Sequence, residues 1–481
     1  MLKDKLLSAT KYKAIKRLNM FFEGYIFPAV YAVIIFITSL FGLEIAFYAL
    51  SLLICIYCTL FCKDSKPLLN LFISIVYSTS WRHTPQYPYN SDFFYLQSVH
   101  ISILAMASVA VICFIFRMAV FGNGKSFFKD SRLRLGIILM CLAFLLNGVF
   151  YSDYTFKNLG LGVLVALSFF TAYLFFFGTL DVTDDTAKYV AYILTLAGGI
   201  IFLQIAKLYI FDGVIVDGSI DKDLIKLGWG MSNNAGGMLA IFLPSCFYLA
   251  LKVKRGGGLL YALGFVYYLG VCLTLSRTSV LVGGIVLLCM FIYFSVKKTS
   301  FRKFVWIFNG ALAAFGIVFV AVFWNKLTEI FAVYFERGFS DSGRLQIWLE
   351  GLKDFVSAPI FGVGFYGSGD FYDIDNWVFP DMYHNLFIQM LASCGLAGIA
   401  ALVIHFVQVV FCVNKKPDSK TAFYLIIPAV IVAVSLLDNH IFHIFPAIVY
   451  SVFLLLIERD GEEYPLKKPK GLLRPKSYKN K

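Results

Sequence analysis

Charged residues are scarce in this chain of 481 residues: they make up 15% of it, while 59% of the residues are apolar and 18% are aromatic. Together with a mean hydropathy of +0.77, this composition excludes a soluble globular domain of ordinary amino-acid usage. The alternation of a β-barrel is also absent. Apolar stretches of about 17 to 25 residues recur instead, and each can cross a bilayer as a helix. The sequence therefore predicts an all-α, polytopic bundle of membrane helices.

Cysteines are lacking in the predicted outer loops, because all ten lie in or at the ends of apolar stretches, and this excludes a disulfide framework there. Cys55, Cys58 and Cys62 share a helix face without a thioredoxin-like pattern, so we interpret them as small packing residues. No small-residue cleavage site follows the first apolar stretch, which we expect to be retained as a span. The two halves of the chain also lack the internal repeat that transporters commonly carry.

The apolar stretches predict about 12 to 14 transmembrane helices. They lie near residues 25–42, 44–62, 67–80, 94–117, 133–150, 158–180, 188–211, 235–251, 259–275, 279–296, 304–324, 386–412, 421–437 and 441–457. The predicted organisation is a basic cytoplasmic tail (1–24), a transmembrane bundle (25–324), an extracytoplasmic catalytic loop (325–385), C-terminal transmembrane helices (386–457) and a second basic cytoplasmic tail (458–481).

The formal net charge of +13 indicates topology rather than nucleic-acid binding. If the N-terminus is cytoplasmic, most of the 42 lysines and arginines fall in loops on the cytoplasmic side, as the positive-inside rule requires. We therefore expect a multi-pass protein of the cytoplasmic (inner) membrane with both termini in the cytoplasm. The same alternation places the long polar segment from Asn325 to His384 on the extracytoplasmic face.

That long segment carries two helical patterns. Apolar residues recur at helical spacing after Arg344, which predicts an amphipathic helix on the membrane surface or on the bundle, with Asp341 or Ser342 able to cap its start. Residues 326–337 repeat the pattern. A glycine-rich run follows Pro359, and the acidic run 370–375 is interpreted as a solvated or sugar-binding loop, with a divalent-cation site as the alternative.

Three side chains at this face could carry chemistry. Arg277 lies in a short turn between apolar helices, either as a snorkelling arginine or as an anion-binding group facing a cavity. Arg344 is either a surface charge paired with Asp341 or Glu350, or a functional group. His384 is either a capping or buried structural histidine, or a group that takes a proton from a sugar hydroxyl near neutral pH.

Five motifs occur in a characteristic order. They are Ser232-Asn233-Asn234-Ala235 through Pro244, Ser276-Arg277-Thr278-Ser279, Gly343-Arg344-x-x-x-Trp348, Pro359-x-x-Gly362-x-Gly364 and His384-Asn385-x-x-x-Gln389-x-Leu391-x-x-x-Gly395. In this order the chain resembles the O-antigen ligase/polymerase superfamily over about residues 225–410.

The resemblance implies a membrane glycosyltransferase that polymerises or ligates surface-polysaccharide units from a polyprenyl (undecaprenyl) diphosphate-linked donor. It implies that Arg277 and Arg344 bind the diphosphate, that His384 activates the acceptor hydroxyl, and that transfer inverts the sugar without metal or cofactor. The substrate-binding positions that it suggests are Asn233, Asn234, Trp348, Gly362, Gly364, Asn385 and Gln389. A nearby polar group, Asp438, His440 and His443, either lines the cavity or joins two helices.

Alternatives remain at this stage. The number of spans favours a polymerase of O-antigen or capsule repeats over a ligase that modifies lipid A core or protein. A small-solute transporter is the alternative from another class, although the gathering of polar residues at one face favours an enzyme. The expected partners are the lipid-linked oligosaccharide donor, a glycan acceptor, the bilayer, and a chain-length regulator or flippase, but no nucleic acid.

Overall fold

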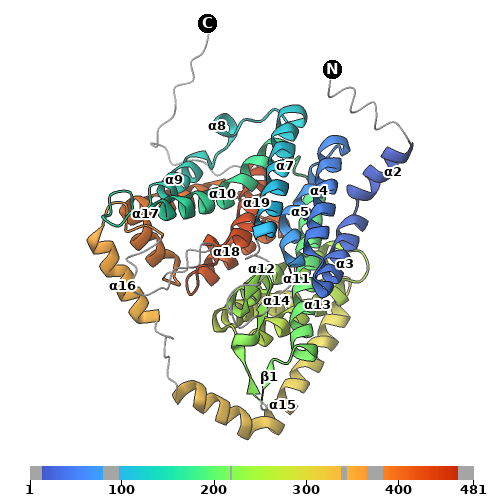
Figure 1. Ribbon diagram of the computed structural model, residues 1–481. Coiled ribbons are helices and arrows are strands. Elements are labelled where there is room, and N and C mark those ends of the chain that lie inside the picture. The colour runs from blue at the N-terminus through green and yellow to red at the C-terminus, as the bar shows by residue number, and fades with distance from the viewer. Residues whose placement is uncertain (1–12, 80–96, 217–218, 337–343, 366–382, 464–481) are drawn as a thin grey trace.

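The computed structural model describes residues 13–79, 97–216, 219–336, 344–365 and 383–463, most of which form helices (Figure 1). The first half contains the helices α2 (Lys13–Phe22), α3 (Ile26–Phe41), α4 (Glu44–Phe61), α5 (Lys66–Ser74), α7 (Gln97–Phe121), α8 (Phe127–Asp130), α9 (Arg134–Leu145), α10 (Phe156–Thr179) and α11 (Asp184–Phe211), with the 3-10 helices η1 (Ile75–Ser78) and η2 (Lys222–Leu224). The second half contains α12 (Ser232–Lys252), α13 (Gly257–Leu273), α14 (Arg277–Val296), α15 (Arg302–Glu336), α16 (Arg344–Ser357), α17 (Leu386–Cys412), α18 (Ser419–Ser435), the 3-10 helix η3 (His440–Phe442) and α19 (Ile444–Glu463).

The predicted all-α polytopic membrane bundle is confirmed. Within the described ranges, eight helices are long and apolar enough to cross a membrane: α4, α7, α10, α11, α12, α14, α15 and α17. The helices α2 and α3, bent by 69° at their junction, would make a ninth span. The other predicted spans form shorter apolar helices (α9, α13 and α18), the short α5 with η1, and α19, which carries charged residues near its end.

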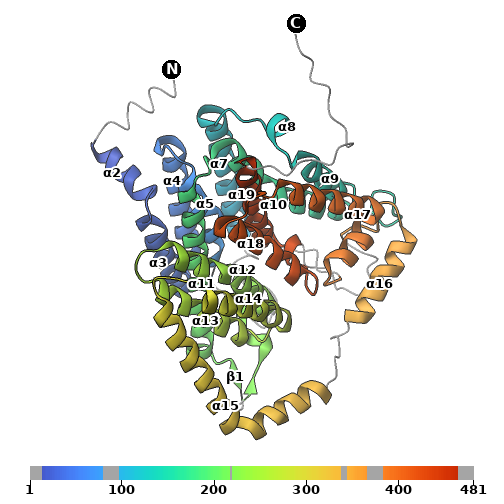
Figure 2. The ribbon, with the colours of Figure 1, turned by 180° about the vertical axis from the view of Figure 1, so that it is seen from behind.

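The helix α12 forms the centre of the bundle. In its apolar window 89% of the residues are buried, because it packs against α11, α13, α14 and α18. Both views place it in the interior of the ribbon (Figures 1 and 2). In contrast, only 6% of the window of α7 and 11% of that of α15 are buried, as expected for helices that face lipid. A central, fully covered helix can hold the elements at its ends in fixed positions.

Two short hairpins connect α11 to α12. The strands β1 (Ile215–Val216) and β2 (Ser219–Ile220) pair antiparallel, as do β3 (Lys226–Leu227) and β4 (Gly230–Met231). The buried Trp229 indole donates to the Gln204 side-chain oxygen on α11 at 3.0 Å. The loop with β1 lies at the opposite end of the bundle from α8 (Figure 1).

The end of α4 is closed by a buried arginine from α7. Arg117 is 1% exposed, and its guanidinium donates to the carbonyl oxygens of Thr59 (3.2 Å), Cys62 (2.7 Å) and Lys63 (2.9 Å). Its Nε also donates to the Ser65 hydroxyl at 3.3 Å. The last carbonyls of a helix have no partner within it, so this side chain supplies the missing donors.

The loop helices also follow the sequence patterns. The amphipathic pattern at residues 326–337 belongs to the last part of α15, which ends at Glu336. The amphipathic pattern after Arg344 forms α16, which packs against α17 at Gly351. A Cβ added to Gly351 would come within 2.7 Å of the Tyr383 ring. The Tyr383 hydroxyl donates to the Asp354 carboxylate at 2.5 Å. The proposed caps at 341 and 342 lie outside the described residues.

Candidate active site

His384 is held by the start of α17. The next residue, Asn385, is the N-cap of that helix, and its side-chain oxygen accepts from the backbone N–H groups of Phe387 (2.9 Å) and Ile388 (3.1 Å). Its amide nitrogen donates to the Leu436 carbonyl beyond the end of α18 at 2.8 Å. His384 itself has a φ of 47°, in the left-handed region that residues other than glycine rarely adopt. The predicted binding residue Asn385 is thus a helix cap that fixes His384 beside the end of α18.

The end of α18 brings Asp438 to His384. The His384 Nδ1 lies 3.1 Å from Asp438 Oδ1, and the two side chains are 26% and 8% exposed. Burial opposes ionisation of this carboxyl, but the hydrogen bond from His384, together with electrostatic interaction with the nearby histidines, holds the pKa of Asp438 well below its ordinary value. An ionised Asp438 only accepts hydrogen bonds, so a neutral His384 carries its proton on Nδ1 and leaves Nε2 as the basic nitrogen.

The adjacent 3-10 helix places a second histidine against α12. His440 is 1% exposed, and its Nε2 lies 3.2 Å from the Asn233 carbonyl oxygen in the first turn of α12. A Cβ added to Gly237 would overlap that ring, so a glycine is required for this approach. Within the described residues, the buried His440 Nδ1 has no hydrogen-bond partner. The predicted residue Asn233 therefore contributes its backbone oxygen to this cluster.

The turn that carries Arg277 packs on the same turn of α12. A Cβ at Gly236 would lie 2.5 Å from the Thr274 hydroxyl and 2.9 Å from that of Ser279. The Ser276 and Ser279 hydroxyls are 2.8 Å apart, and both residues are buried. Arg277 is the exposed first residue of α14. Gly236 and Gly237 thus bring the Arg277 turn and the His440 cluster against neighbouring positions of one helix.

Arg344 is the first residue of α16 and is half-buried. It precedes Gly351, which packs on α17, by about two helical turns, so the two residues share a face. Trp348 lies on this face too, and its buried Nε1 has no hydrogen-bond partner among the described residues. Arg344 is therefore the first residue on the face of α16 that packs against α17. The first turn of α17 directly follows His384 and Asn385.

Gln389 connects the residue before His384 with the residue after Asp438. It is fully buried; its side-chain oxygen accepts from the Tyr383 N–H at 3.2 Å and from the Asn439 amide at 3.1 Å, while its own amide donates to Ser393 at 2.8 Å. These contacts position the residues before His384 and after Asp438. Binding of substrate by Gln389 stays a prediction.

The glycine-rich run lies along a break in α17. Gly395 has a φ of 63° there, and Gly362 and Gly364 have φ values of 70° and 93°. The Val363 and Gly364 N–H groups donate to carbonyls of α17 at 2.8 and 3.1 Å, and the Leu396 N–H donates back to Pro359 at 2.8 Å. The glycines permit this backbone contact, which orients the first part of α17. Binding of substrate by Gly362 and Gly364 stays a prediction. Asn234, another predicted binding residue, packs against Gly230.

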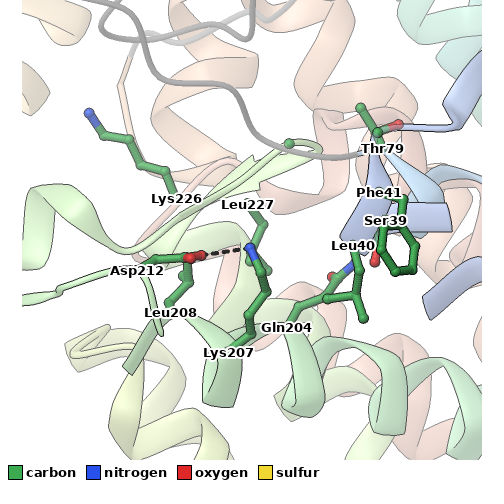
Figure 3. Close-up of a pocket in the computed structure, with 12 residues that line it drawn as sticks. Ser39, Leu40, Phe41, Thr79, Gln204, Lys207, Leu208, Asp212, Lys226 and Leu227 are labelled. Carbon is green, nitrogen blue, oxygen red and sulfur yellow. Dashed lines mark hydrogen bonds and ion pairs between the residues drawn. The ribbon is translucent and has the colours of Figure 1, made fainter. Parts of the chain in front are cut away.

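A cavity of about 300 Å³ lies elsewhere, between the end of α3, α11 and β3 (Figure 3). Lys207 donates to Asp212 at its wall over 2.8 Å. The predicted site residues are not among its lining residues. The described part of the chain contains no group of histidine, cysteine or carboxylate residues able to hold a metal, and the acidic run 370–375 lies outside that part.

Asp438 is the residue that sequence reasoning left without a role in catalysis. The sequence feature that could have indicated this role is the polar run Asp438-Asn439-His440, which lies in a short loop predicted on the extracytoplasmic face. The sequence does not indicate a functional role for Gly236 and Gly237. A glycine is needed there only because other elements pack closely on α12, and the sequence pattern does not show which elements do so.

Residues 260–403 match the family model described as O-antigen ligase. The match covers less than a third of the chain and includes Arg277, Arg344 and His384, whereas Asp438 and Asn233 lie outside it. It confirms the resemblance to the O-antigen ligase/polymerase superfamily and supports an O-antigen ligase- or polymerase-type function in general. The apolar helices agree with a multi-pass membrane protein. No curated protein matches the chain.

Proposed function

We propose that this protein is a membrane glycosyltransferase that transfers a glycan from a polyprenyl diphosphate-linked donor to an acceptor hydroxyl at the extracytoplasmic face of the inner membrane. The observation that carries the proposal is the contact of 3.1 Å between His384 Nδ1 and Asp438 Oδ1. An imidazole oriented by a carboxylate is the arrangement used to remove a proton from a hydroxyl. The family match supports glycan transfer as the reaction that this pair serves.

In the proposed step, the acceptor oxygen attacks the anomeric carbon while His384 Nε2 takes its proton. The bond between that carbon and the diphosphate oxygen breaks, and the electron pair leaves with the polyprenyl diphosphate. Attack opposite the leaving group inverts the anomeric centre. Asp438 stabilises the imidazolium that forms, because its carboxylate is ionised and accepts the Nδ1 proton in a hydrogen bond.

Two arginines stabilise the leaving diphosphate in this proposal. Arg277 stands at the first position of α14, where the positive end of the helix dipole favours an anion. The side chain of Ser276, its N-cap, makes no capping hydrogen bond. Arg344 begins the face of α16 that packs on α17, and a guanidinium can bind phosphate oxygens in a bidentate manner. Charge stabilisation of this kind commonly supplies the largest part of a rate enhancement.

The acceptor decides between two versions of this reaction. We propose a polymerase of O-antigen or capsule type, with both termini in the cytoplasm and a chain-length regulator or flippase as partners. A ligase to lipid A core or protein would use the same residues. A small-solute transporter is the alternative from another class. Proton-coupled transporters also use histidine and carboxylate pairs, so it is the family match that favours the enzyme.

Reconstitution tests the proposal. The full chain in nanodiscs is supplied with a polyprenyl diphosphate-linked repeat unit as the only substrate. A ladder of product lengths supports the polymerase, and product that appears only with a separate lipid or protein acceptor supports the ligase. If neither condition gives product, the proposed function is wrong.

Substitutions then test the residues. His384→Ala, Arg277→Ala and Arg344→Ala should abolish product while the protein still inserts and purifies as a monodisperse sample. Lys353→Ala is the matched control on α16, since this lysine is exposed and, among the described residues, its ion pair is with Glu350 one turn away. Unchanged activity of His384→Ala would rule out its role.

A further inference from the structure

The helix α16 presents three distinct faces. Its packing face contains Arg344, Trp348, Gly351 and Phe355 and is directed to α17. Its polar face contains Gln346, Glu350, Lys353 and Ser357, with a Glu350–Lys353 ion pair of 2.7 Å. Its third face, the apolar stripe, contains Leu345, Leu349, Leu352 and Val356 at spacings of four, three and four residues, which align on one side of a helix.

The apolar stripe is exposed along its whole length. Its four side chains, in sequence order, have exposed fractions of 58%, 50%, 41% and 75%. Both views place α16 at the outer edge of the bundle, beside α17 (Figures 1 and 2). A helix that has already buried one face against its own chain does not need a second apolar face for folding, so this stripe requires a separate explanation.

The stripe continues into a second exposed apolar group. Ile360, one turn beyond Val356, is 62% exposed, and its neighbour Phe361 makes an edge contact with Phe150 at a ring-centroid distance of 5.4 Å. Phe150 is 83% exposed. The Gly148 N–H also donates to the Phe361 carbonyl at 2.9 Å, so the two segments are tied together. Exposed phenylalanine and leucine side chains that form one apolar surface are typical of segments that lie in the interface between membrane and water.

We propose that the apolar stripe of α16, with Ile360 and Phe150, inserts into the lipid interface of the membrane that the bundle spans. A helix with an apolar face, an ion-paired polar face and only moderate overall apolarity lies in the plane of that interface. The occupant is lipid rather than a protein partner, because α16 packs on α17, a candidate span that itself exposes the apolar side chains Leu396, Val403 and Val410.

Insertion has a consequence for Arg344, and only this consequence rests on the proposed function. Arg344 directly precedes the stripe but lies on the packing face, so an inserted α16 holds its guanidinium at headgroup depth and turned toward α17. The diphosphate of a polyprenyl-linked donor lies at that depth as well. α16 thereby sets the height at which the donor's phosphates are bound.

An environment-sensitive fluorescent amino acid tests the insertion. It is placed in the full chain in nanodiscs at position 349 or 356 of the stripe, and at position 346 or 353 of the polar face as matched controls. We expect blue-shifted emission at 349 and 356 that is quenched by lipids with a nitroxide near the headgroup, and water-like, weakly quenched emission at 346 and 353.

Two results would overturn the proposal. Water-like emission at all four positions would show that the stripe faces solvent. A blue shift at 349 and 356 without quenching by nitroxide lipid would show that protein, such as a second copy of this chain, covers the stripe.

A kinetic measurement separates this proposal from the proposed function. The double variant Leu349→Glu with Val356→Glu should raise the KM for the lipid-linked donor several-fold with little change in kcat, whereas Gln346→Glu should leave both unchanged. Quenching without any glycan transfer by the unmodified protein would refute the proposed function and leave the insertion standing. Transfer without quenching would do the reverse.

Discussion

Replacing Asp438 with asparagine tests the candidate active site with the smallest change of shape. The asparagine side chain keeps an oxygen that can accept the Asn439 N–H, which now donates to Asp438 over 2.9 Å. It removes the negative charge. In the other orientation of the side chain, its amide takes the place of Oδ1, which now contacts both the Asn439 N–H and His384 Nδ1, and donates to Nδ1. A donor at that position would favour the tautomer with its proton on Nε2, the nitrogen that should receive the acceptor's proton.

The size of the effect follows from the separation of the two groups. At 3.1 Å and an effective dielectric constant of about 20, a carboxylate and an imidazolium attract by roughly 5 kcal/mol as an upper bound. Solvent reaches the partly exposed imidazole and weakens this attraction, so we expect about 3 kcal/mol of lost transition-state stabilisation. That loss corresponds to a decrease in kcat of roughly 100-fold, and the tautomer change adds to it.

The assay is the initial rate of transfer from a fluorescent lipid-linked donor in nanodiscs, at saturating donor so that kcat is measured. Glu350→Gln, which removes a partly exposed carboxylate from α16, is the control and should retain full activity. Thermal unfolding of Asp438→Asn establishes that the variant is folded. A folded Asp438→Asn variant with kcat within about threefold of the unmodified protein would refute the pairing of His384 and Asp438 as a catalytic unit.

Three further predictions concern stability and packing. Arg117→Met should lower the free energy of unfolding by about 3 to 5 kcal/mol, because it leaves buried carbonyls without donors, and an unchanged melting temperature in detergent would contradict this. Gly237→Ala should sharply reduce transfer activity because its methyl group overlaps the His440 ring, whereas Gly310→Ala, with no atom within 4 Å, should be neutral in the same assay. The stability that ionised Asp438 contributes should be fully present above its unfolded pKa of about 3.9 and lost as pH falls through its lowered folded pKa. Melting curves recorded from about pH 6 down to about pH 2 should show this loss in the unmodified protein but not in Asp438→Asn, and identical pH profiles for the two proteins would contradict it.

Local properties of the chain were sufficient for much of the architecture. Apolar runs long enough to cross a bilayer predict helices wherever they occur, since a backbone in lipid must satisfy its own hydrogen bonds. The amphipathic period after Arg344 predicts α16, and the described residues Arg344–Ser357 form that helix. Arg277 and His384 stood out because a cation and a titratable group are unusual at the end of an apolar helix.

What the sequence determined by itself is the class of the molecule: a helical membrane protein with polar residues collected at one face, in motifs that resemble glycan-transferring enzymes. Only the tertiary structure decided that His384 contacts Asp438, 54 positions away, and that His440 rests on the bare backbone of Gly237. It also placed Gly362 and Gly364 against the break in α17. Helical periodicity determines which residues share a face, but the partner of that face depends on how the helices pack, which no local pattern encodes.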